Sequence, residues 1–304
     1  MLSHASCQSN PPQESTSSVP KMQVVADSLW LSWPYDLVRP AKKMSLPEEL
    51  IEVSALSYYA DGELVMVNDE LGKYYIFDLD QEEISRKVSF ALDGDFEGVE
   101  RVNDQLYILR SDGFIFRVDD PEAEEPEMNS FRTFLSDNDD TEGLGYDPTT
   151  GQLLIACKEP ARNMDRDDRY RAVYALNLDT KELAEEPLLT LDLAEVKAFL
   201  MASAQTEDEK EEAEEFEVKK EKSFKPSAIA VHPISGHYYL MASAGKLLLV
   251  LNRSGRVIGA AHLPRKRFSQ PEGICFSPEG DLYISNEGRD GAASLLWFRY
   301  QPNP

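Results

Sequence analysis

The stretch PEGICFSPEGDLYISNE, residues 271–287, carries the pattern that decides the fold. Apolar and polar residues alternate through it, as expected for β-strands, and Glu279-Gly280 supplies a tight turn between two such strands. The same order of features occurs at four earlier places: an acidic or hydroxyl residue, a small residue, an apolar run and then a turn. The five segments start at these anchor residues: Ser54, Glu97, Glu142, Ser227 and Glu272.

The spacing of the anchors identifies the repeat. Successive anchors are 43, 45, 85 and 45 residues apart. A period near 45 residues is typical of a four-stranded propeller blade. We therefore predict an all-β chain that forms a single five-bladed β-propeller, with four antiparallel strands per blade. A six-bladed propeller is the alternative, because the long interval is close to two repeats.

The ring is expected to close with chain from the other end of the sequence. An outer strand is predicted in four units, at residues 84–92, 129–135, 187–193 and 257–263. The last unit ends without one, and residues 42–52 are expected to supply it. Closure of this kind leaves no open sheet edge.

The long interval is explained by an insertion between blades 3 and 4. Apolar residues from 193 to 204 have helical spacing, and the run TEDEKEEAEEFEVKKEK at 206–222 is charged and lacks a strand pattern. We predict a helical, acidic insertion at about residues 194–222, within a propeller domain that covers 22–304.

The first 21 residues are expected to be a disordered tether, since they are rich in Pro, Gln, Ser and Thr. The sequence HASC ending at Cys7 looks like the end of a lipoprotein signal, although the basic and apolar regions of a full signal are not present before it. We therefore expect a lipoprotein of the bacterial cell envelope, in the periplasm or on the outer membrane, that touches membrane only through a lipid on Cys7. A cytoplasmic location is the alternative.

The charge balance restricts the partners. The net charge is −24, from 55 acidic against 31 basic residues. Such a field repels phosphate backbones, which excludes nucleic acid, and it suits cations or basic partners. Cys157 and Cys275 fall within apolar strand patterns and are expected to be small buried side chains.

Three sequence features carry a family resemblance: the Glu-Gly-Leu/Ile motifs at blade starts, YDPTTGQLLIACKE at 146–159 and PEGICFSPEGDLYISNE at 271–287. The chain resembles the SdiA-regulated (YjiK-like) family of bacterial proteins over about residues 48–300. Glu-Gly motifs before a strand also occur in NHL-like and lactonase-like propellers. The resemblance implies a five-bladed propeller with a bound calcium ion, in an exported or envelope protein without established catalytic activity. The acidic insertion departs from the family pattern.

The anchors point to a metal site. Inner strands of a propeller start at one mouth of the central channel, so the anchors should form a ring of three carboxylates and two hydroxyls. Three such carboxylates need a cation or basic groups to stay ionised, and calcium accepts six to eight oxygen ligands. A second ring is expected where the second strands end: Asn68 or Asp69, Arg110, Lys158 or Glu159, Ser243, and Asn286 or Glu287. The candidate calcium ligands are Glu97, Glu142, Glu272, Asn68, Asp69, Glu159 and Glu287.

A purely structural ring is the alternative to a metal site. The glutamates would then cap backbone amides, and the small residue after each anchor would allow tight packing at the axis.

The leading functional prediction is a calcium-binding envelope propeller that acts as a binding or scaffolding module, with a protein or small-molecule partner that the sequence does not identify. The rival is a calcium-dependent hydrolase of lactonase or phosphoesterase (phytase-like) type. The metal would polarise a carbonyl or phosphoryl oxygen, with Asp69 or Glu287 as the base. The sequence contains no GxSxG nucleophile motif and no phosphate-binding glycine loop. It therefore identifies no catalytic residues.

Overall fold

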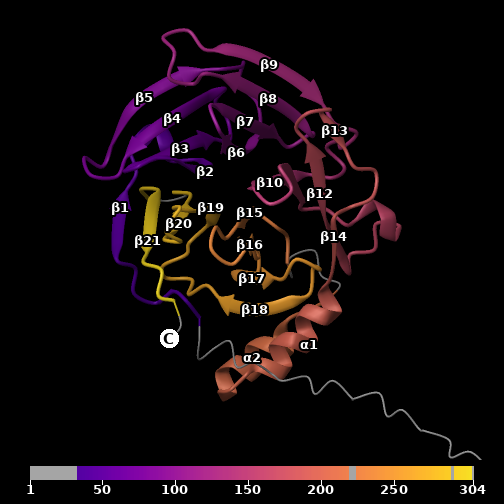
Figure 1. The fold of residues 1–304 in the computed structure, drawn as a ribbon. Helices are drawn as coiled ribbons and strands as arrows, with labels where there is room; N and C mark the ends of the chain where they lie inside the picture. Colours follow the sequence, from indigo (N-terminus) through magenta and orange to yellow (C-terminus); the bar gives the residue numbers. More distant parts are fainter. Residues whose placement is uncertain (1–32, 219–223, 289–290, 303–304) are drawn as a thin grey trace, which may run out of the picture.

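The computed structural model describes residues 33–218, 224–288 and 291–302. Within these ranges the strands form five antiparallel sheets arranged around a central axis, as Figure 1 shows. The five-bladed propeller is therefore confirmed, and the long interval holds no sixth sheet in the described residues. The motif at Cys7 and the predicted tether lie outside these ranges.

The strands follow the predicted repeat. Blade 1 contains β2 (Val53–Ala60), β3 (Glu63–Asn68), β4 (Lys73–Asp78) and β5 (Glu83–Ser89). Blade 2 contains β6 (Phe96–Val102), β7 (Gln105–Arg110), β8 (Phe114–Asp119) and β9 (Glu127–Arg132). Blade 3 contains β10 (Thr141–Asp147), β11 (Gln152–Cys157), β12 (Tyr170–Asn177), β13 (Glu182–Leu183) and β14 (Leu189–Asp192). Blade 4 contains β15 (Ala228–Val231), β16 (Tyr238–Ala242), β17 (Leu247–Leu251) and β18 (Val257–His262). Blade 5 contains β19 (Pro271–Phe276), β20 (Leu282–Asn286), β21 (Ser294–Phe298) and β1 (Lys42–Ser45).

The N-terminal strand closes the ring. β1 pairs antiparallel with β21, with Met44 opposite Leu295, so it is the outer strand of blade 5. It is shorter than the predicted 42–52. Pro47 has no N–H for a ladder, and a 3₁₀ turn, η2 (Glu48–Leu50), follows it.

The outer edge of blade 3 also differs from the prediction. Two short strands, β13 and β14, pair with opposite ends of β12 in place of one strand at 187–193. Pro187 lies between them, where a continuous ladder would need its missing N–H. The outer strands of blades 1 and 2 end earlier than predicted, at Ser89 and Arg132.

The core lies between neighbouring sheets and reaches to the axis. Buried apolar side chains form clusters at each seam between blades. The inner strands approach so closely that a Cβ on Gly98 would lie 2.5 Å from the Cβ of Leu144 in the next blade. The small residue after an anchor therefore has the packing role expected of it.

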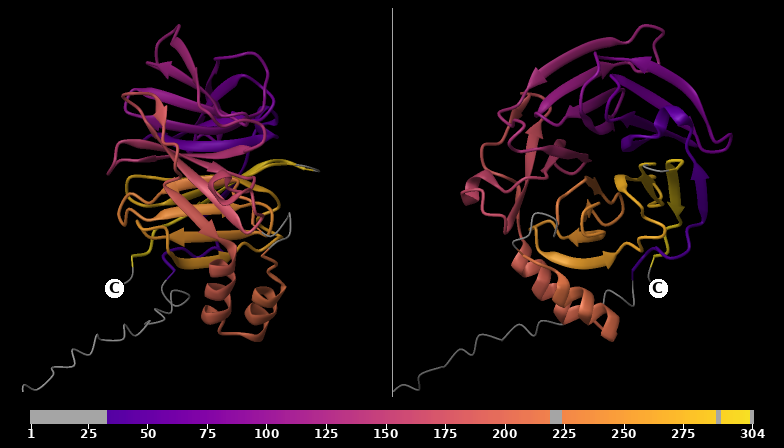
Figure 2. Two further views of the ribbon diagram at one scale, coloured as in Figure 1. Left: turned by 90° about the vertical axis from the view of Figure 1, so that its right-hand side faces the viewer. Right: turned by 180° about the vertical axis from the view of Figure 1, so that it is seen from behind.

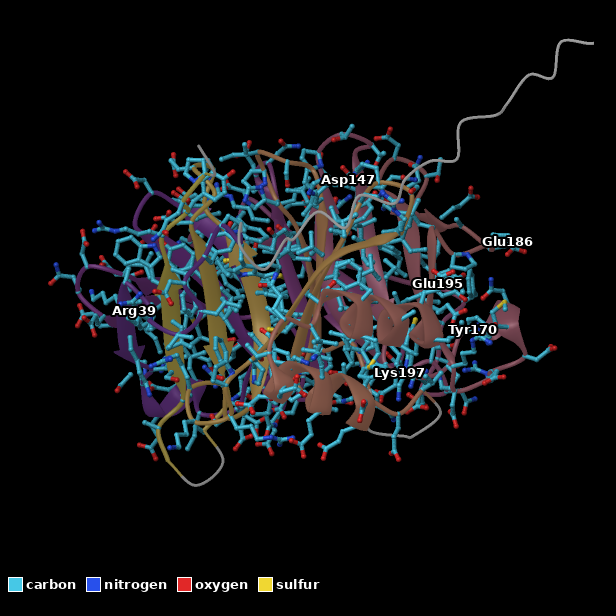
Figure 3. All side chains as sticks on the ribbon, turned by 90° about the horizontal axis from the view of Figure 1, so that it is seen from below. Arg39, Asp147, Tyr170, Glu186, Glu195 and Lys197 are labelled. Carbon is cyan, nitrogen blue, oxygen red and sulfur yellow. The ribbon has the colours of Figure 1, made fainter. Side chains whose placement is uncertain are left out.

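The insertion folds into two helices on the outer wall, α1 (Leu193–Ser203) and α2 (Glu207–Glu215). Asp192 caps α1 by accepting the N–H of Ala194 at 2.8 Å, and Thr206 forms a capping box with Glu209 at α2. Leu193, Val196 and Leu200 of α1 are buried in the same cluster as side chains of blades 3 and 4. Figures 1 and 2 show both helices outside β18, and in Figure 3 Glu195 and Lys197 mark α1 along the wall.

No helix among the described residues is both long and apolar enough to span a bilayer.

An aromatic cluster fastens the segment before β1 to blades 4 and 5. The Tyr35 hydroxyl donates to the carbonyl of Gly280 at 2.6 Å, and Nε2 of His232 lies 2.8 Å from the same hydroxyl. The other imidazole nitrogen accepts the backbone N–H groups of Ile234 and Ser235. Burial lowers the pKa of His232 to about 4, so the imidazole is neutral when it makes these contacts at neutral pH.

Candidate functional site

β-bulges position the anchors at one mouth of the channel. The pairing register between first and second strands shifts around Ser54, Glu97, Glu142 and Glu272. Each is the extra residue of its bulge, without a partner opposite it, and a bulge re-aims such a side chain. The same local device thus places an anchor at the start of four of the five inner strands.

The two hydroxyl anchors join neighbouring blades. The Ser54 hydroxyl donates to the carbonyl of Phe96 at 2.5 Å, and the Ser227 hydroxyl donates to the carbonyl of Pro271 at 3.0 Å. Both acceptors belong to the next inner strand around the ring. These serines therefore contribute to ring assembly.

Glu142 lies deepest among the three carboxylates, at 3% exposure. Nζ of Lys158 lies 2.5 Å from its Oε1 and 4.0 Å from Oδ2 of Asp140. Burial still raises the pKa of Glu142 above its usual range, although Lys158 opposes this. One ammonium group thus only partly compensates the burial of this carboxylate.

Glu97 and Glu272 share the mouth with Glu142. Burial, and then repulsion from Glu142 and Asp95, raises the pKa of Glu97 far above its usual range. Burial also raises the pKa of Glu272, although a hydrogen bond with Ser243 acts in the opposite direction. The mouth therefore favours bound protons or a bound cation over free carboxylates.

Two predicted ligands in the second ring have other partners. The side-chain oxygen of Asn68 accepts the backbone N–H groups of Glu70 and Leu71, at 2.9 and 3.1 Å, and so closes the turn after β3. Glu159 forms an ion pair with Lys225, 2.6 Å from Oε1 to Nζ. Neither side chain is free to reach toward the three glutamates without losing these contacts.

The two basic residues expected in the second ring have different partners: Lys158 contacts Glu142, whereas Arg110 pairs with Asp112. Arg110 forms a two-pronged ion pair with Asp112, at 2.9 Å for both contacts. Asp112 thereby neutralises the charge of Arg110 locally, so Arg110 does little to compensate the carboxylates of the mouth.

A neighbouring part of the mouth holds a second acidic group. Burial and then Glu52 raise the pKa of Asp69 to about 6, and its Oδ1 is buried without a hydrogen-bond partner. Burial and a hydrogen bond with Glu52 raise the pKa of Glu287 to about 7, and Glu272 adds repulsion. These carboxylates extend the negative region beyond the anchor ring.

Asn286 is a polar residue of the mouth whose whole amide group lacks partners among the described residues. It is 1% exposed, and neither its amide oxygen nor its amide nitrogen has a hydrogen-bond partner in the part of the chain that the structure describes. An unpaired buried amide costs about 1–3 kcal/mol, so the position calls for a ligand or solvent. Asn286 stood in the expected second ring but not among the predicted ligands, because sequence spacing does not show which polar groups lack partners.

The seven predicted ligands do not form one preassembled set. In the described part of the chain, no three carboxylate, imidazole or thiol groups converge closely enough to hold a metal ion. Glu97, Glu142 and Glu272 influence one another electrostatically, and Glu272 and Asp69 both influence Glu287. Binding of an ion would therefore require side chains at the mouth to rearrange.

The fold and the site define the class: a five-bladed β-propeller with an acidic channel mouth. The chain belongs to the SdiA-regulated family, whose sequence model matches residues 35–289. The search of curated proteins found no match.

Solved structures include similar propellers. Glutaminyl cyclase from Myxococcus xanthus superposes with a TM-score of 0.56 and 12% identity, over 88% of this chain and 97% of that one. The PQQ-bound aldose sugar dehydrogenase from Streptomyces coelicolor has a TM-score of 0.49 and 10% identity, over 86% and 97% of the two chains. At 12% identity the likeness to the cyclase shows the fold alone.

Proposed function

We propose that the protein is a calcium-binding propeller that serves as a non-catalytic binding module, with the ion at the acidic channel mouth. One observation carries the proposal: Glu97, Glu142 and Glu272 share the mouth, and Lys158 contacts only one of them directly. A divalent cation would compensate the remaining charge and release the protons that the raised pKa values retain.

The donor chemistry at the mouth suits a hard cation. Glu97, Glu142 and Glu272 supply carboxylate oxygens, and Asn286 supplies a buried amide oxygen that has no other partner. Calcium accepts such oxygen ligands in loose geometry, whereas zinc prefers nitrogen and sulfur. Because Lys158 already contacts Glu142, its ammonium group competes with the ion.

The binding role is supported by how the remaining polar groups are used. Ser54 and Ser227 bond to backbone of the next blade, and Asn68 closes a turn. These contacts are architectural, and they leave the carboxylates as the groups available to a cation. The partner would then contact the loops around the mouth.

Calorimetry tests the metal proposal. Calcium is titrated into protein previously dialysed against EDTA, in two buffers of different ionisation enthalpy. We expect binding with proton release in the wild type, and loss of binding in the Glu97→Gln/Glu272→Gln variant. Glu124→Gln, on an exposed loop of blade 2, is the matched control and should bind normally. The proposal is refuted if the wild type gives no binding heat with calcium and its melting temperature is the same with and without EDTA.

The same preparation separates binding from catalysis. Lactone and phosphoester substrates are supplied at saturating calcium to the wild type and to Glu142→Gln. We expect no turnover. If the wild type turns over a substrate and Glu142→Gln does not, the protein is a metal-dependent hydrolase and the non-catalytic role is wrong.

We also place the protein at the cell envelope, on the strength of the motif around Cys7. An alkyne-labelled palmitate fed to expressing bacteria should label the wild type and leave Cys7→Ala unlabelled. Equal labelling of both proteins, or of neither, would contradict the lipid anchor.

A further inference from the structure

A cavity of about 270 Å³ lies at the seam between blades 1 and 5. The turns after β2, β4 and β19 border it, so it lies at the opposite end of the inner strands from the anchors. Figure 1 shows β1, β20 and β21 beside the strands of blade 1 at this seam. We call this cavity the seam pocket. It shares no residue with the acidic mouth.

Aromatic side chains line the seam pocket. Tyr58, Tyr283 and Trp297 contribute to its wall, and the rings of Tyr283 and Trp297 are nearly parallel, at 8° with centroids 6.3 Å apart. Tyr283 is only 6% exposed, and its hydroxyl makes no hydrogen bond with any described residue. The hydroxyl of a tyrosine that lines a cavity and has no partner is available to a ligand.

The polar rim of the pocket is strongly acidic. Asp61, Asp80 and Glu279 line it, and none of them forms an ion pair with a described residue. Among the described residues that line the pocket, Lys42 is the one cation, and it pairs with Glu82, 2.9 Å from Nζ to Oε1. The guanidinium of Arg299 also lies near the pocket, 5.3 Å from the centroid of the Trp297 ring, but one cation does not balance three carboxylates, so the pocket retains net negative charge.

Asp281 organises the aromatic wall. Its Oδ2 accepts the indole N–H of Trp297 at 2.8 Å, and its Oδ1 accepts the backbone N–H of Tyr300 at 2.8 Å. The indole is thereby held in one orientation. A pre-positioned ring lowers the ordering cost of binding.

We propose that the seam pocket binds a small organic cation: an ammonium or guanidinium group on a short aliphatic chain. The rings of Tyr58, Tyr283 and Trp297 offer cation–π and apolar contacts, and the carboxylates of Asp61 and Glu279 offer charge pairing. The Tyr283 oxygen can accept an N–H from the ligand.

Two further features agree with this ligand class. The guanidinium of Arg299 already lies over the Trp297 ring, 5.3 Å from its centroid, so this surface accommodates such a group. The volume of about 270 Å³ lies just below the usual range of small-molecule sites, about 300–1,000 Å³, which favours a short ligand. The same chemistry can come from a free amine or from a basic side chain of a peptide.

Agmatine, which carries both an ammonium and a guanidinium group, is the test probe, and 1,4-butanediol is its uncharged control. Calorimetry should show binding of agmatine and none of the diol. Asp61→Asn/Glu279→Gln should weaken binding about tenfold, since two partly exposed charge pairs are removed. Tyr283→Phe keeps the ring and its packing and should weaken binding about threefold.

Two controls make the result specific. Glu124→Gln changes the same charge far from the pocket and should leave agmatine binding unchanged. Glu97→Gln/Glu272→Gln should also leave it unchanged, because the acidic mouth lies at the other end of the channel. A short peptide with one arginine, compared with its alanine counterpart, shows whether a peptide side chain binds more tightly than the free amine.

The proposal is overturned if agmatine does not bind, or if Asp61→Asn/Glu279→Gln binds it as the wild type does. It is also overturned if Glu124→Gln weakens binding equally, which would indicate attraction to net charge alone. Circular dichroism of each variant confirms that the propeller is intact, and Tyr283→Phe keeps the test valid if the double variant unfolds.

Discussion

Replacement of Lys158 by Met should have opposite effects on stability and on calcium affinity. Lys158 places its ammonium 2.5 Å from a carboxylate oxygen of Glu142, which is 3% exposed. Methionine keeps the length of the side chain and removes the charge. The calcium-free protein should therefore become less stable, and the mouth should bind calcium more tightly because a competing cation is gone.

The size of the effect follows from the contact. Two unit charges 4 Å apart interact by about 4 kcal/mol at an effective dielectric constant of about 20. Lys158 is 35% exposed, so solvent screens part of this, and Glu142 can take up a proton when it loses its partner. We expect a loss of about 2 kcal/mol in the free energy of unfolding without calcium. Calcium affinity should rise about tenfold.

Urea denaturation in EDTA and in calcium measures both effects on the same variant. Lys43→Met, on the exposed side of β1, is the matched control and should behave as the wild type. Saturating calcium should remove most of the stability loss of Lys158→Met. The reasoning is refuted if Lys158→Met is as stable as the wild type in EDTA, or if its calcium affinity falls.

Three further predictions concern groups away from that ion pair. Burial holds the pKa of His232 near 4 against 6.5 for a free imidazole, so stability should fall as pH drops from about 6.5 to 4. His232→Gln should remove up to about 3 kcal/mol of this pH-dependent change in the free energy of unfolding, as measured by urea titration at several pH values. An unchanged pH dependence would count against the burial argument. Burial raises the pKa of Glu100 to about 8, so its contribution is full at acid pH and is lost as pH rises from about 4.5 to 8. Glu100→Gln should therefore be about 1–2 kcal/mol more stable than the wild type above pH 8, which the same titrations would show or exclude. A Cβ on Gly273 would lie 2.5 Å from Oγ of Ser285, so Gly273→Ala should lose about 1–3 kcal/mol in thermal or urea unfolding, while Gly291→Ala, with nothing within 4 Å, should not.

The helical insertion illustrates how far local sequence patterns reach. Apolar spacing and charge composition predicted helices near 194–222, and α1 and α2 occupy Leu193–Ser203 and Glu207–Glu215. The capping residues Asp192 and Thr206 are also local signals. Which wall of the propeller the helices cover depended on apolar side chains of blades 3 and 4, which lie far from them in the sequence.

The three anchor glutamates of the candidate site were predictable from the sequence, but their contacts and the unpaired amide of Asn286 were not. The repeat placed Glu97, Glu142 and Glu272 at equivalent positions, because period and alternation are properties of the chain itself. The β-bulges that present them, and the choice of Lys158 rather than Arg110 as their partner, were not visible in the sequence. Both depend on which groups approach across neighbouring strands and loops.

By itself, the sequence indicated a propeller, its closing strand and the three anchor glutamates, since each rests on a repeat of about 45 residues with turns at fixed places. The sheet topology then decided for five blades over the six-bladed alternative. Tertiary structure alone decided which polar groups are paired and which are not. Within the described ranges it left the amide of Asn286 and the hydroxyl of Tyr283 without partners, and it joined β1, β2 and β20 into the seam pocket. The reason is physical: strand formation follows local alternation, whereas pairing, burial and cavities arise only where distant segments meet.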